Sequence, residues 1–490
     1  MNIELNRGSR IPLARQIKQA IADRILSGYF KKGARLPSVR KLAQSLRVSP
    51  VTVIHALDLL ETKGLVKRIH GKGTFVYEDE NESETEQTEE PTPFPVSDYL
   101  HRSQHWYFHQ RESEINFSLC AVHPELLPAS DLAQSIRQLA MKDPEVLVQY
   151  GEIQGDLELR RTMAKNLARE HLALSPQEVL VTNGAQQGID LVARSFIGPG
   201  DLVVTEEPTY TAAIDAFRSR GANLLTVPMD EEGIRIDKLT ALLDTYKPKL
   251  IYTIPSFQNP TGNVMSAKRR RELFDLARHT NCLILEDDPW SEIFFDKAPP
   301  PPIKSLDQSG HVIYLKGISK MLSPGCRVGF LTASGTVLHR LVAAKTHADL
   351  GNPLLNQKVI LPLLQPENLS SLLKQLRTVL KKRRDTALRL LRHYAPPQIQ
   401  WTIPQGGLNL WISLPERIRA NSLLQEAEKR RISFLPGSSC YPGDPEWNHL
   451  RISFSYVDEG QLKEGIQKLC SILSAYLASA ESRKGETPLF

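Results

Sequence analysis

The stretch 311-HVIYLKGISKMLSPGCRVGFLT-332 decides the fold of the larger part of this 490-residue chain. It contains two short apolar runs, joined by a polar loop that carries Lys320. Such runs are typical of buried strands of a sheet. Lys320 therefore follows the end of a predicted strand, where open α/β sheets place their ligands. A lone lysine at such a position is more often an ordinary surface residue, so Lys320 needs support from elsewhere in the chain.

Similar strands are predicted upstream, separated by helical segments such as 267–280. The predicted strands are 179–182, 201–205, 250–255 and 282–287. Strands that alternate with helices predict a mostly parallel α/β sheet.

Polar segments follow several of these strands. NGAQQG (183–188) combines a glycine turn with a helix start, which can bind an anion through free backbone N–H groups. SFQNPTG (256–262) and the carboxylates 286–288 follow two other strands. Each segment alone also fits an ordinary turn or a solvated loop.

Taken together and in this order, the segments resemble fold-type I pyridoxal-phosphate (PLP) aminotransferases across residues 115–480. The matching motifs are QYGEIQGDLELR, TNGAQQG, EEPTY, QNPTG, LEDDPW, ISKMLSPGCRVGF, PQGGLNLW, PGSSCY and LRISFS. The resemblance implies an α/β domain with a mostly parallel sheet, a small C-terminal α+β subdomain, and PLP as cofactor.

The resemblance also implies roles for single residues. Lys320 would form the Schiff base with the cofactor, and Asp287 would pair with its pyridine nitrogen; these two are the predicted catalytic residues. Asn259 would bind the phenolic oxygen, and Tyr210 would stack on the ring. Arg451 would bind the α-carboxylate of an amino acid. The phosphate would be held by Gly184, Ala185, Gln186, Ser319 and Arg327, and by Tyr150 of a neighbouring subunit, which implies a homodimer.

Two residues depart from the family pattern. Gly317 replaces a usual Ser or Thr that holds the phosphate, so one hydroxyl contact is lost. Trp290 stands where related enzymes have Tyr, and its indole N–H can donate a hydrogen bond but never accept one. Cofactor binding is expected to survive both changes, whereas transaminase activity is expected to be weak.

Charge is distributed unevenly along the chain, whose total is +6. Residues 1–77 carry 15 basic and 4 acidic side chains, whereas 78–90 carry 8 acidic side chains and no basic one. We predict a nucleic-acid-binding head (1–77), an acidic flexible linker (78–114), the body (115–480) and a polar tail (481–490). The basic runs 268–271 and 381–384 are interpreted as solvated helix faces.

Composition excludes several classes of protein. Five scattered cysteines without a CxxC motif exclude a disulfide scaffold and a cysteine-based zinc site, and no metal site is expected. They fit a reducing, cytoplasmic location. No apolar stretch is long enough to span a membrane, and no signal peptide is expected.

The basic head reads as a winged helix-turn-helix. Helices are predicted from Pro12, from Ser38 and from Ser49, followed by a hairpin over 65–77. A three-helix domain with a solvated basic face is the alternative. The segments PLARQIKQAIADRILSGYFKKGARLPSVRKLAQSLRVS, TV..AL..LE..GLV and GKGTFV resemble the DNA-binding domain of GntR-type regulators.

That resemblance implies DNA contacts from Arg40, Ser49, Thr52, His70, Gly71 and Lys72, with further phosphate contacts from Lys67 and Arg68. At Pro50 and Val51 the family usually has an arginine followed by a polar residue, and that arginine reads a base edge. Its absence removes a contact worth about 1–3 kcal/mol of base discrimination. Binding is therefore expected to survive but to depend strongly on salt.

Both halves together resemble MocR-type transcription regulators. The first hypothesis is a PLP-dependent regulator that binds promoter DNA and senses an amino acid or amine, as a homodimer whose heads could cross to the partner subunit. The alternative is a working aminotransferase with an accessory DNA-binding domain. A third possibility is a DNA-binding protein whose body binds no cofactor.

Overall fold

The structure is a computed structural model that describes residues 12–26, 30, 33–46, 48–62, 64–69, 73–77, 113–443 and 445–485. The chain divides into two compact units, Met1–Gln104 and His105–Phe490. Three predicted DNA contacts (His70, Gly71 and Lys72) and nearly all of the predicted linker lie outside the described residues.

The first unit has the order of elements that the sequence predicts. Its elements are α1 (Leu13–Leu26), α2 (Val39–Leu46), α3 (Pro50–Thr62), β1 (Val66–Ile69) and β2 (Gly73–Val76), and the two strands pair antiparallel. Ser38 and Ser49 cap their helices, since their hydroxyls accept hydrogen bonds from the backbone N–H groups of Lys41 at 3.3 Å and Thr52 at 3.2 Å. The buried apolar faces of the three helices form one core.

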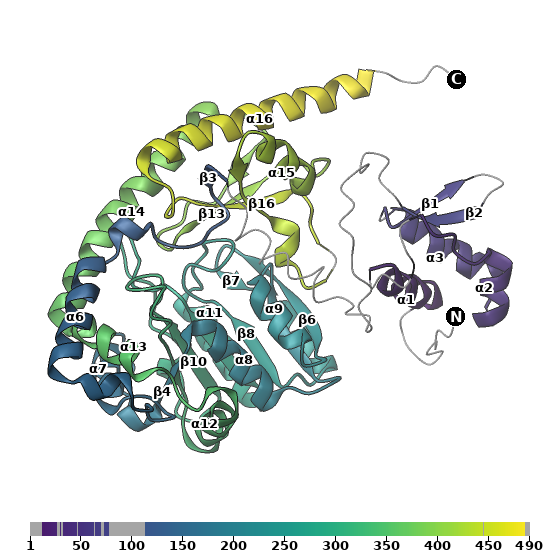
Figure 1. The fold of residues 1–490 in the computed structure, drawn as a ribbon. Helices are drawn as coiled ribbons and strands as arrows, with labels where there is room; N and C mark the ends of the chain where they lie inside the picture. Colours follow the sequence, from purple (N-terminus) through teal and green to yellow (C-terminus); the bar gives the residue numbers. More distant parts are fainter. Residues whose placement is uncertain are drawn as a thin grey trace. The chain divides into compact units, whose positions relative to one another are not determined.

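An eight-stranded sheet, part of which is labelled in Figure 1, lies within the second unit. Its strand order is β4-β11-β10-β9-β8-β5-β6-β7. Its strands are β4 (Val179–Thr182), β5 (Leu202–Glu207), β6 (Asn223–Asp230), β7 (Gly233–Ile234), β8 (Leu250–Thr253), β9 (Leu283–Asp288), β10 (Val312–Gly317) and β11 (Gly329–Thr332). Strands β6, β5, β8, β9 and β10 run parallel, whereas β11 is antiparallel to both β10 and β4. The predicted mostly parallel sheet is confirmed.

Helices cover both faces of this sheet. One face packs against α8 (Gly184–Phe196), α9 (Thr211–Arg218) and α12 (Gly335–Asp349). The other packs against α7 (Leu157–Ala168), α10 (Ile236–Thr245), α11 (Ala267–His279) and α14 (Pro366–Tyr394). Since side chains alternate between the faces of a strand, Asp287 and Asp288 at the end of β9 point to opposite faces.

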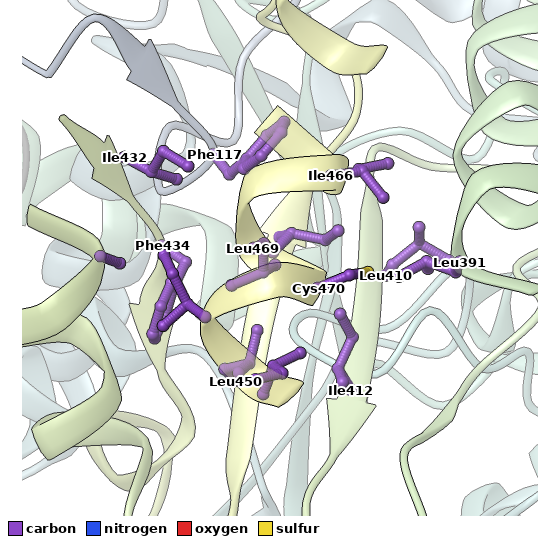
Figure 2. Close-up of a cluster of buried hydrophobic side chains, with 14 of the residues drawn as sticks. Phe117, Leu391, Leu410, Ile412, Ile432, Phe434, Leu450, Ile466, Leu469 and Cys470 are labelled. Carbon is purple, nitrogen blue, oxygen red and sulfur yellow. The ribbon is translucent and has the colours of Figure 1, made fainter. Parts of the chain in front are cut away.

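A smaller subdomain follows. Its antiparallel sheet joins β12 (Gln400–Trp401), β13 (Asn409–Ser413), β16 (His449–Ser453) and β15 (Leu435–Pro436), while β3 (Ile115–Asn116) pairs parallel with β14 (Ile432–Ser433). Figure 2 shows its core, where Leu469 and Cys470 of α16 (Glu459–Gly485) lie over the strands with Leu410, Ile412 and Leu450. Helix α16 continues five residues beyond the boundary predicted at 480.

The remaining elements are short or peripheral. They are η1 (Pro124–Leu126), α6 (Ala129–Lys142), η2 (Pro144–Leu147), η3 (Pro176–Glu178), η4 (Ile303–Leu306), α13 (Leu354–Ile360), η5 (Leu361–Leu364), α15 (Ala420–Lys429) and η6 (Gly437–Cys440). Within the part of the chain that the structure describes, no helix is long and apolar enough to cross a membrane. All five cysteines are free thiols.

The interpretation of the two basic runs as solvated helix faces is wrong in part. Arg270 is buried and donates hydrogen bonds to the carbonyl oxygens of Met265 at 3.1 Å and Pro255 at 3.0 Å. Arg383 and Arg384 are buried as well. These guanidinium groups satisfy loop carbonyls inside the fold, a role that charge patterning cannot distinguish from solvation.

Candidate functional site

A cavity of about 130 Å³ lies at the carboxyl edge of the sheet. It is lined by Ala185, Gln186, Tyr210, Ile254, Asn259, Asp287, Pro289, Trp290, Gly317, Ser319, Lys320 and Arg327. Most of these residues follow the ends of strands β4, β5, β8, β9 and β10. The structure thus brings together eight of the residues that the sequence predicts for a cofactor site.

Asp287 is the buried carboxylate of this cavity and is only 3% exposed. Its Oδ2 accepts a hydrogen bond of 2.7 Å from the hydroxyl of Tyr252, whereas its buried Oδ1 has no partner in the described part of the chain. Burial raises the pKa of Asp287 to about 7, despite the opposing effects of the Tyr252 hydrogen bond and the Lys320 charge. A carboxylate with one free oxygen is suited to pair with a cationic N–H group.

Lys320 reaches the same cavity from the loop after β10. Its Nζ lies 4.6 Å from the centroid of the Trp290 ring. The indole N–H of Trp290 donates to the carbonyl oxygen of Phe257 at 2.7 Å, so the N–H is already bonded and only the ring is next to Lys320.

At Gly317, a Cβ atom would lie 3.3 Å from Cα of Pro289. The loop after β9 therefore leaves little room for a larger residue there.

The N-terminus of α8 forms one end of the cavity. Gly184 begins this helix at φ +73°, and a Cβ atom there would lie 2.7 Å from Nη2 of Arg327. Arg327 also has a positive φ of 52°, and its Nη2 donates to the carbonyl oxygen of Asn183 at 3.3 Å. A guanidinium held beside free helical N–H groups favours a phosphate or a similar anion. Ala185, Gln186 and Ser319 line the same cavity.

Arg451 lies in β16 and is 3% exposed. Its Nη1 donates to Oδ1 of Asn259 at 2.9 Å, and its Nη2 donates to the carbonyl oxygen of Ser118 at 2.6 Å. Its buried Nε–H has no partner among the residues that the structure places. Asn259 lines the cavity, so Arg451 is linked to the cavity through one side chain.

Two aromatic residues differ in their placement. Tyr210 lines the cavity, and its hydroxyl donates to Oε1 of Gln186 at 3.3 Å. Burial, together with the charge of Asp287, raises the pKa of Tyr210 to about 12, so it stays protonated. Tyr150 does not line the cavity and is 89% exposed. Its predicted role needs a second subunit.

Sequence reasoning missed Tyr252, whose hydroxyl holds Asp287. Tyr252 lies in β8 in register with Leu285 of β9, and Leu285 is two residues before Asp287. A strand alternates faces with each residue, so the parallel pairing of 250–253 with 283–286 could have placed this hydroxyl beside Asp287. The signal was a tyrosine hydroxyl in a strand that is otherwise mostly apolar.

Sequence reasoning also missed a buried ion cluster on the opposite face of the sheet. Nζ of Lys316 lies 2.9 Å from Asp288, 3.1 Å from Glu170 and 2.7 Å from Glu292. Burial raises the pKa of Glu170 to about 8. Across the described ranges, no group of three or more His, Cys, Asp or Glu side chains is arranged to hold a metal ion.

The head presents a second candidate site. Arg40 is exposed on α2, while Ser49 and Thr52 bond one another through their hydroxyls at 2.8 Å. Arg68 does not extend freely. Its guanidinium forms an ion pair of 2.7 Å with Asp58 and donates to the carbonyl oxygen of Ile54 at 3.0 Å. The expectation that Arg68 contacts phosphate is therefore not supported by this conformation.

Comparison with known families agrees with both halves. Residues 116–469 match the model of class I and II aminotransferases. The chain belongs to the class I and II aminotransferase family. Residues 13–76 match bacterial regulatory proteins of the gntR family, so this aminotransferase-family chain carries the predicted winged helix-turn-helix head.

One relative spans both parts of the chain, and others match the aminotransferase part. The uncharacterized HTH-type transcriptional regulator YisV of Bacillus subtilis is 33% identical over 94% of this chain and 96% of its own length. The 2-aminoadipate transaminase of Thermus thermophilus is 36% identical over 75% of this chain and 92% of its own. A crystal structure of Pyrococcus horikoshii kynurenine aminotransferase with PMP is 32% identical, with a TM-score of 0.73, and the match covers 78% of this chain and 96% of that one. The predicted MocR-type architecture and fold class are confirmed.

The site of this aminotransferase-family chain fits PLP. The unpartnered Oδ1 of Asp287 offers an acceptor for a protonated pyridine nitrogen. The close approach of Arg327 to Gly184 leaves room for no side chain there, which keeps the helix N–H groups accessible to a phosphate. Lys320 lines the same small cavity. The family and the relative with bound PMP support PLP as the cofactor.

Proposed function

We propose that this protein is a PLP-dependent, DNA-binding transcription regulator whose body senses an amino acid or a related amine. The observation that carries the proposal is that one chain contains both a DNA-binding head and an aminotransferase-family body. A winged helix-turn-helix matches 13–76, and a cavity with an ionisable acceptor, a lysine and an anion site lies within 116–469. The regulator-named relative covers both parts.

PLP, when bound, supplies an aldehyde that condenses with amino groups and a ring that withdraws electrons. Asp287 would hold a proton at the ring nitrogen, because its Oδ1 is free and buried. Lys320 would provide the resident amino group. Gly184, Ala185, Gln186, Ser319 and Arg327 would bind the phosphate. Asn259 and Tyr210, which also line the cavity, would help to hold the ring.

Arg451 would select the effector. Its Nε–H is buried and unpartnered within the described ranges, while its other nitrogens are oriented by Asn259 and Ser118. A carboxylate accepts hydrogen bonds from an arginine in a bidentate manner. An α-amino acid would satisfy Arg451 and present its amino group toward the cavity that contains Lys320. An amine without a carboxylate would leave Arg451 unpaired and would bind more weakly.

A homodimer is the form we propose for the body. Apolar side chains gather on α6, on η2 and on the loop after it: Ile136, Met141, Leu147, Val148 and Tyr150 are exposed. A Cβ atom on Gly151 would lie 2.8 Å from the carbonyl oxygen of Asn352, so this loop lies beside exposed Leu350. Exposed apolar patches of this kind mark protein interfaces. A second copy that covers the patch would bring its own Tyr150 near the phosphate site.

The effector must bind two states of the protein differently to change DNA binding. The test is a DNA-shift titration of full-length protein with and without PLP, repeated with L-amino acids and with the corresponding amines that lack a carboxylate. Products of amino-group transfer to a 2-oxo acid are measured in the same tubes. We expect an amino acid to shift the DNA affinity, and its decarboxylated amine to act more weakly.

Amino-acid transamination is the second candidate, favoured by the presence of Lys320, Asp287 and Arg451 and by the similarity to a 2-aminoadipate transaminase. Rapid turnover with DNA affinity that no amino acid alters would favour this function over regulation. Absence of any absorbance from bound cofactor would contradict both and leave a DNA-binding protein whose body binds no PLP.

A further inference from the structure

We infer that α3 recognises thymine in its DNA site, through contacts of Val51 and Ile54 with the C5-methyl groups in the major groove. The inference rests on the proposed DNA-binding function and adds the base type that the helix reads. In a helix-turn-helix, the second helix of the motif lies in the major groove and uses its N-terminal residues on base edges. Here that helix is α3.

Two branched aliphatic side chains occupy the exposed face of α3 near its start. Val51 is 72% exposed and Ile54 is 40% exposed. They are three residues apart, so they lie side by side on one helix face. The opposite face is fully buried, with Val53, Leu57 and Leu60 at 0% exposure. The core of the head therefore does not need Val51 or Ile54, which leaves both available for a partner.

Other means of reading bases are weak on this helix. Residues 48–62 contain no Lys or Arg, so no side chain of α3 can donate a bidentate pair to guanine. The hydroxyls of Ser49 and Thr52 bond one another, and Ser49 also caps the Thr52 N–H. Asp58 pairs with Arg68. Of the polar side chains in the first two turns, His55 is exposed and could supply a single hydrogen bond.

Thymine is the base that matches this surface. It alone presents a methyl group in the major groove, and apolar side chains contact that methyl. Burial of one such group corresponds to about a fourfold gain in affinity. Two adjacent aliphatic residues are matched to neighbouring thymines, whereas they would leave the polar edges of guanine and cytosine without partners.

The experiment compares thymine with deoxyuridine, which differs by the methyl group alone. Full-length, PLP-loaded protein first selects duplexes from a random-sequence pool. Each thymine of the selected site is then replaced by deoxyuridine, and affinity is measured by fluorescence anisotropy at constant salt. We expect a three- to tenfold loss at one to three positions and less than a twofold change elsewhere.

Val51→Ala and Ile54→Ala link the effect to the helix. Each variant should bind the thymine duplex more weakly than the wild type does. At the position that the replaced side chain contacts, its affinities for the thymine and deoxyuridine duplexes should differ by less than twofold. Alanine is a stronger helix former than either residue, so α3 is expected to remain folded. Ile69→Ala is the matched control, since Ile69 in β1 is 39% exposed but lies outside α3. This control should keep the wild-type ratio at every position.

Two results would overturn the inference while leaving DNA binding intact. One is equal affinity for thymine and deoxyuridine at every position of the site. The other is selection of guanine or cytosine at the positions that Val51→Ala affects. A protein that retains no duplex from the pool would contradict the proposed regulator as well.

Discussion

The hydroxyl of Tyr252 lies 2.7 Å from Oδ2 of Asp287 and donates a hydrogen bond to it, while Oδ1 of the same carboxylate stays unpartnered among the described residues. Both residues face the helices α8 and α9, one from β8 and one from β9. The buried environment raises the pKa of Asp287 to about 7, and the Tyr252 hydrogen bond opposes that rise. Tyr252 thus favours the ionised form that a pyridinium nitrogen requires.

Tyr252→Phe is expected to weaken PLP binding about 10- to 100-fold near pH 7, because a hydrogen bond to a charged group contributes about 1.5–3 kcal/mol. Without the donor, the pKa of Asp287 rises further. As the pH is lowered, Asp287 is then protonated earlier, so the affinity for PLP should begin to fall at a higher pH than in the wild type. PLP titration across pH measures both effects. Tyr314→Phe is the control, since its hydroxyl donates to Asp288 on the other face. An unchanged pH profile in Tyr252→Phe would refute the role of Tyr252.

Gly184→Ala is expected to lower PLP affinity strongly. Its Cβ would lie 2.7 Å from Nη2 of Arg327, so the guanidinium must leave its place beside the helix terminus. The positive φ adds a backbone cost of about 1–2 kcal/mol for a residue with a Cβ atom. Gly335→Ala has the same backbone cost at φ +57° but meets no atom within 4 Å. Equal PLP affinities in the two variants would show that the anion site does not depend on Arg327.

Most of the cofactor site was predictable because its residues follow strand ends in a recognisable order. Lys320, Asp287 and Asn259 occupy such positions, and a parallel sheet brings the ends together. The contacts that adjust these groups were not predictable. The bond from Trp290 to the Phe257 carbonyl depends on loop geometry, which no spacing encodes. The burial of Arg270 depends on loop carbonyls from distant segments.

In the head, too, the helices were predictable from the sequence but the side-chain contacts were not. Periodicity and caps placed α1, α2 and α3 close to their observed bounds. Arg68 was predicted to contact a DNA phosphate, yet it pairs with acidic residues of α3. A net charge records how many cations there are but not which of them are already paired.

Glu170→Gln should remove a pH dependence of stability. The pKa of Glu170 is raised by burial from 4.5 to about 8. Between these values the folded state keeps a proton that the unfolded state has lost, so the stability of the wild type falls as pH rises through this window. The unfolding free energy of Glu170→Gln minus that of the wild type should therefore increase from pH 4.5 to 8 and stay constant above pH 8. Chemical denaturation at several pH values measures it.

Lys316→Met, in the same cluster, should lower the stability of the protein relative to the wild type. Nζ of Lys316 is the cation that Asp288 and Glu292 share with Glu170. Its removal leaves buried carboxylates without a counter-charge, which costs about 3–5 kcal/mol. The loss should be largest at high pH, when all three carboxyl groups would ionise. A Lys316→Met protein as stable as the wild type at pH 8 would contradict the assigned ion pairs.

Arg68→Ala is expected to weaken DNA binding by exposing negative charge rather than by losing a phosphate contact. Arg68 lies 2.7 Å from Asp58 and 3.7 Å from Glu61, both on the exposed face of α3. Without Arg68, the two carboxylates would face DNA phosphates and repel them. Affinity should fall about fivefold at low salt, by anisotropy titration, and the difference should shrink as salt screens the charges.

The variant that combines Arg68→Ala with Asp58→Asn and Glu61→Gln separates these two explanations. If Arg68 acts by neutralising α3, removing both carboxylates restores most of the lost affinity, and the slope of log affinity against log salt returns close to that of the wild type. If Arg68 contacts a phosphate instead, the combined variant stays as weak as Arg68→Ala, and its salt slope is smaller by about one. The observed ion pair favours restoration, because a guanidinium bound to Asp58 and to the Ile54 carbonyl must break both contacts before it can reach DNA.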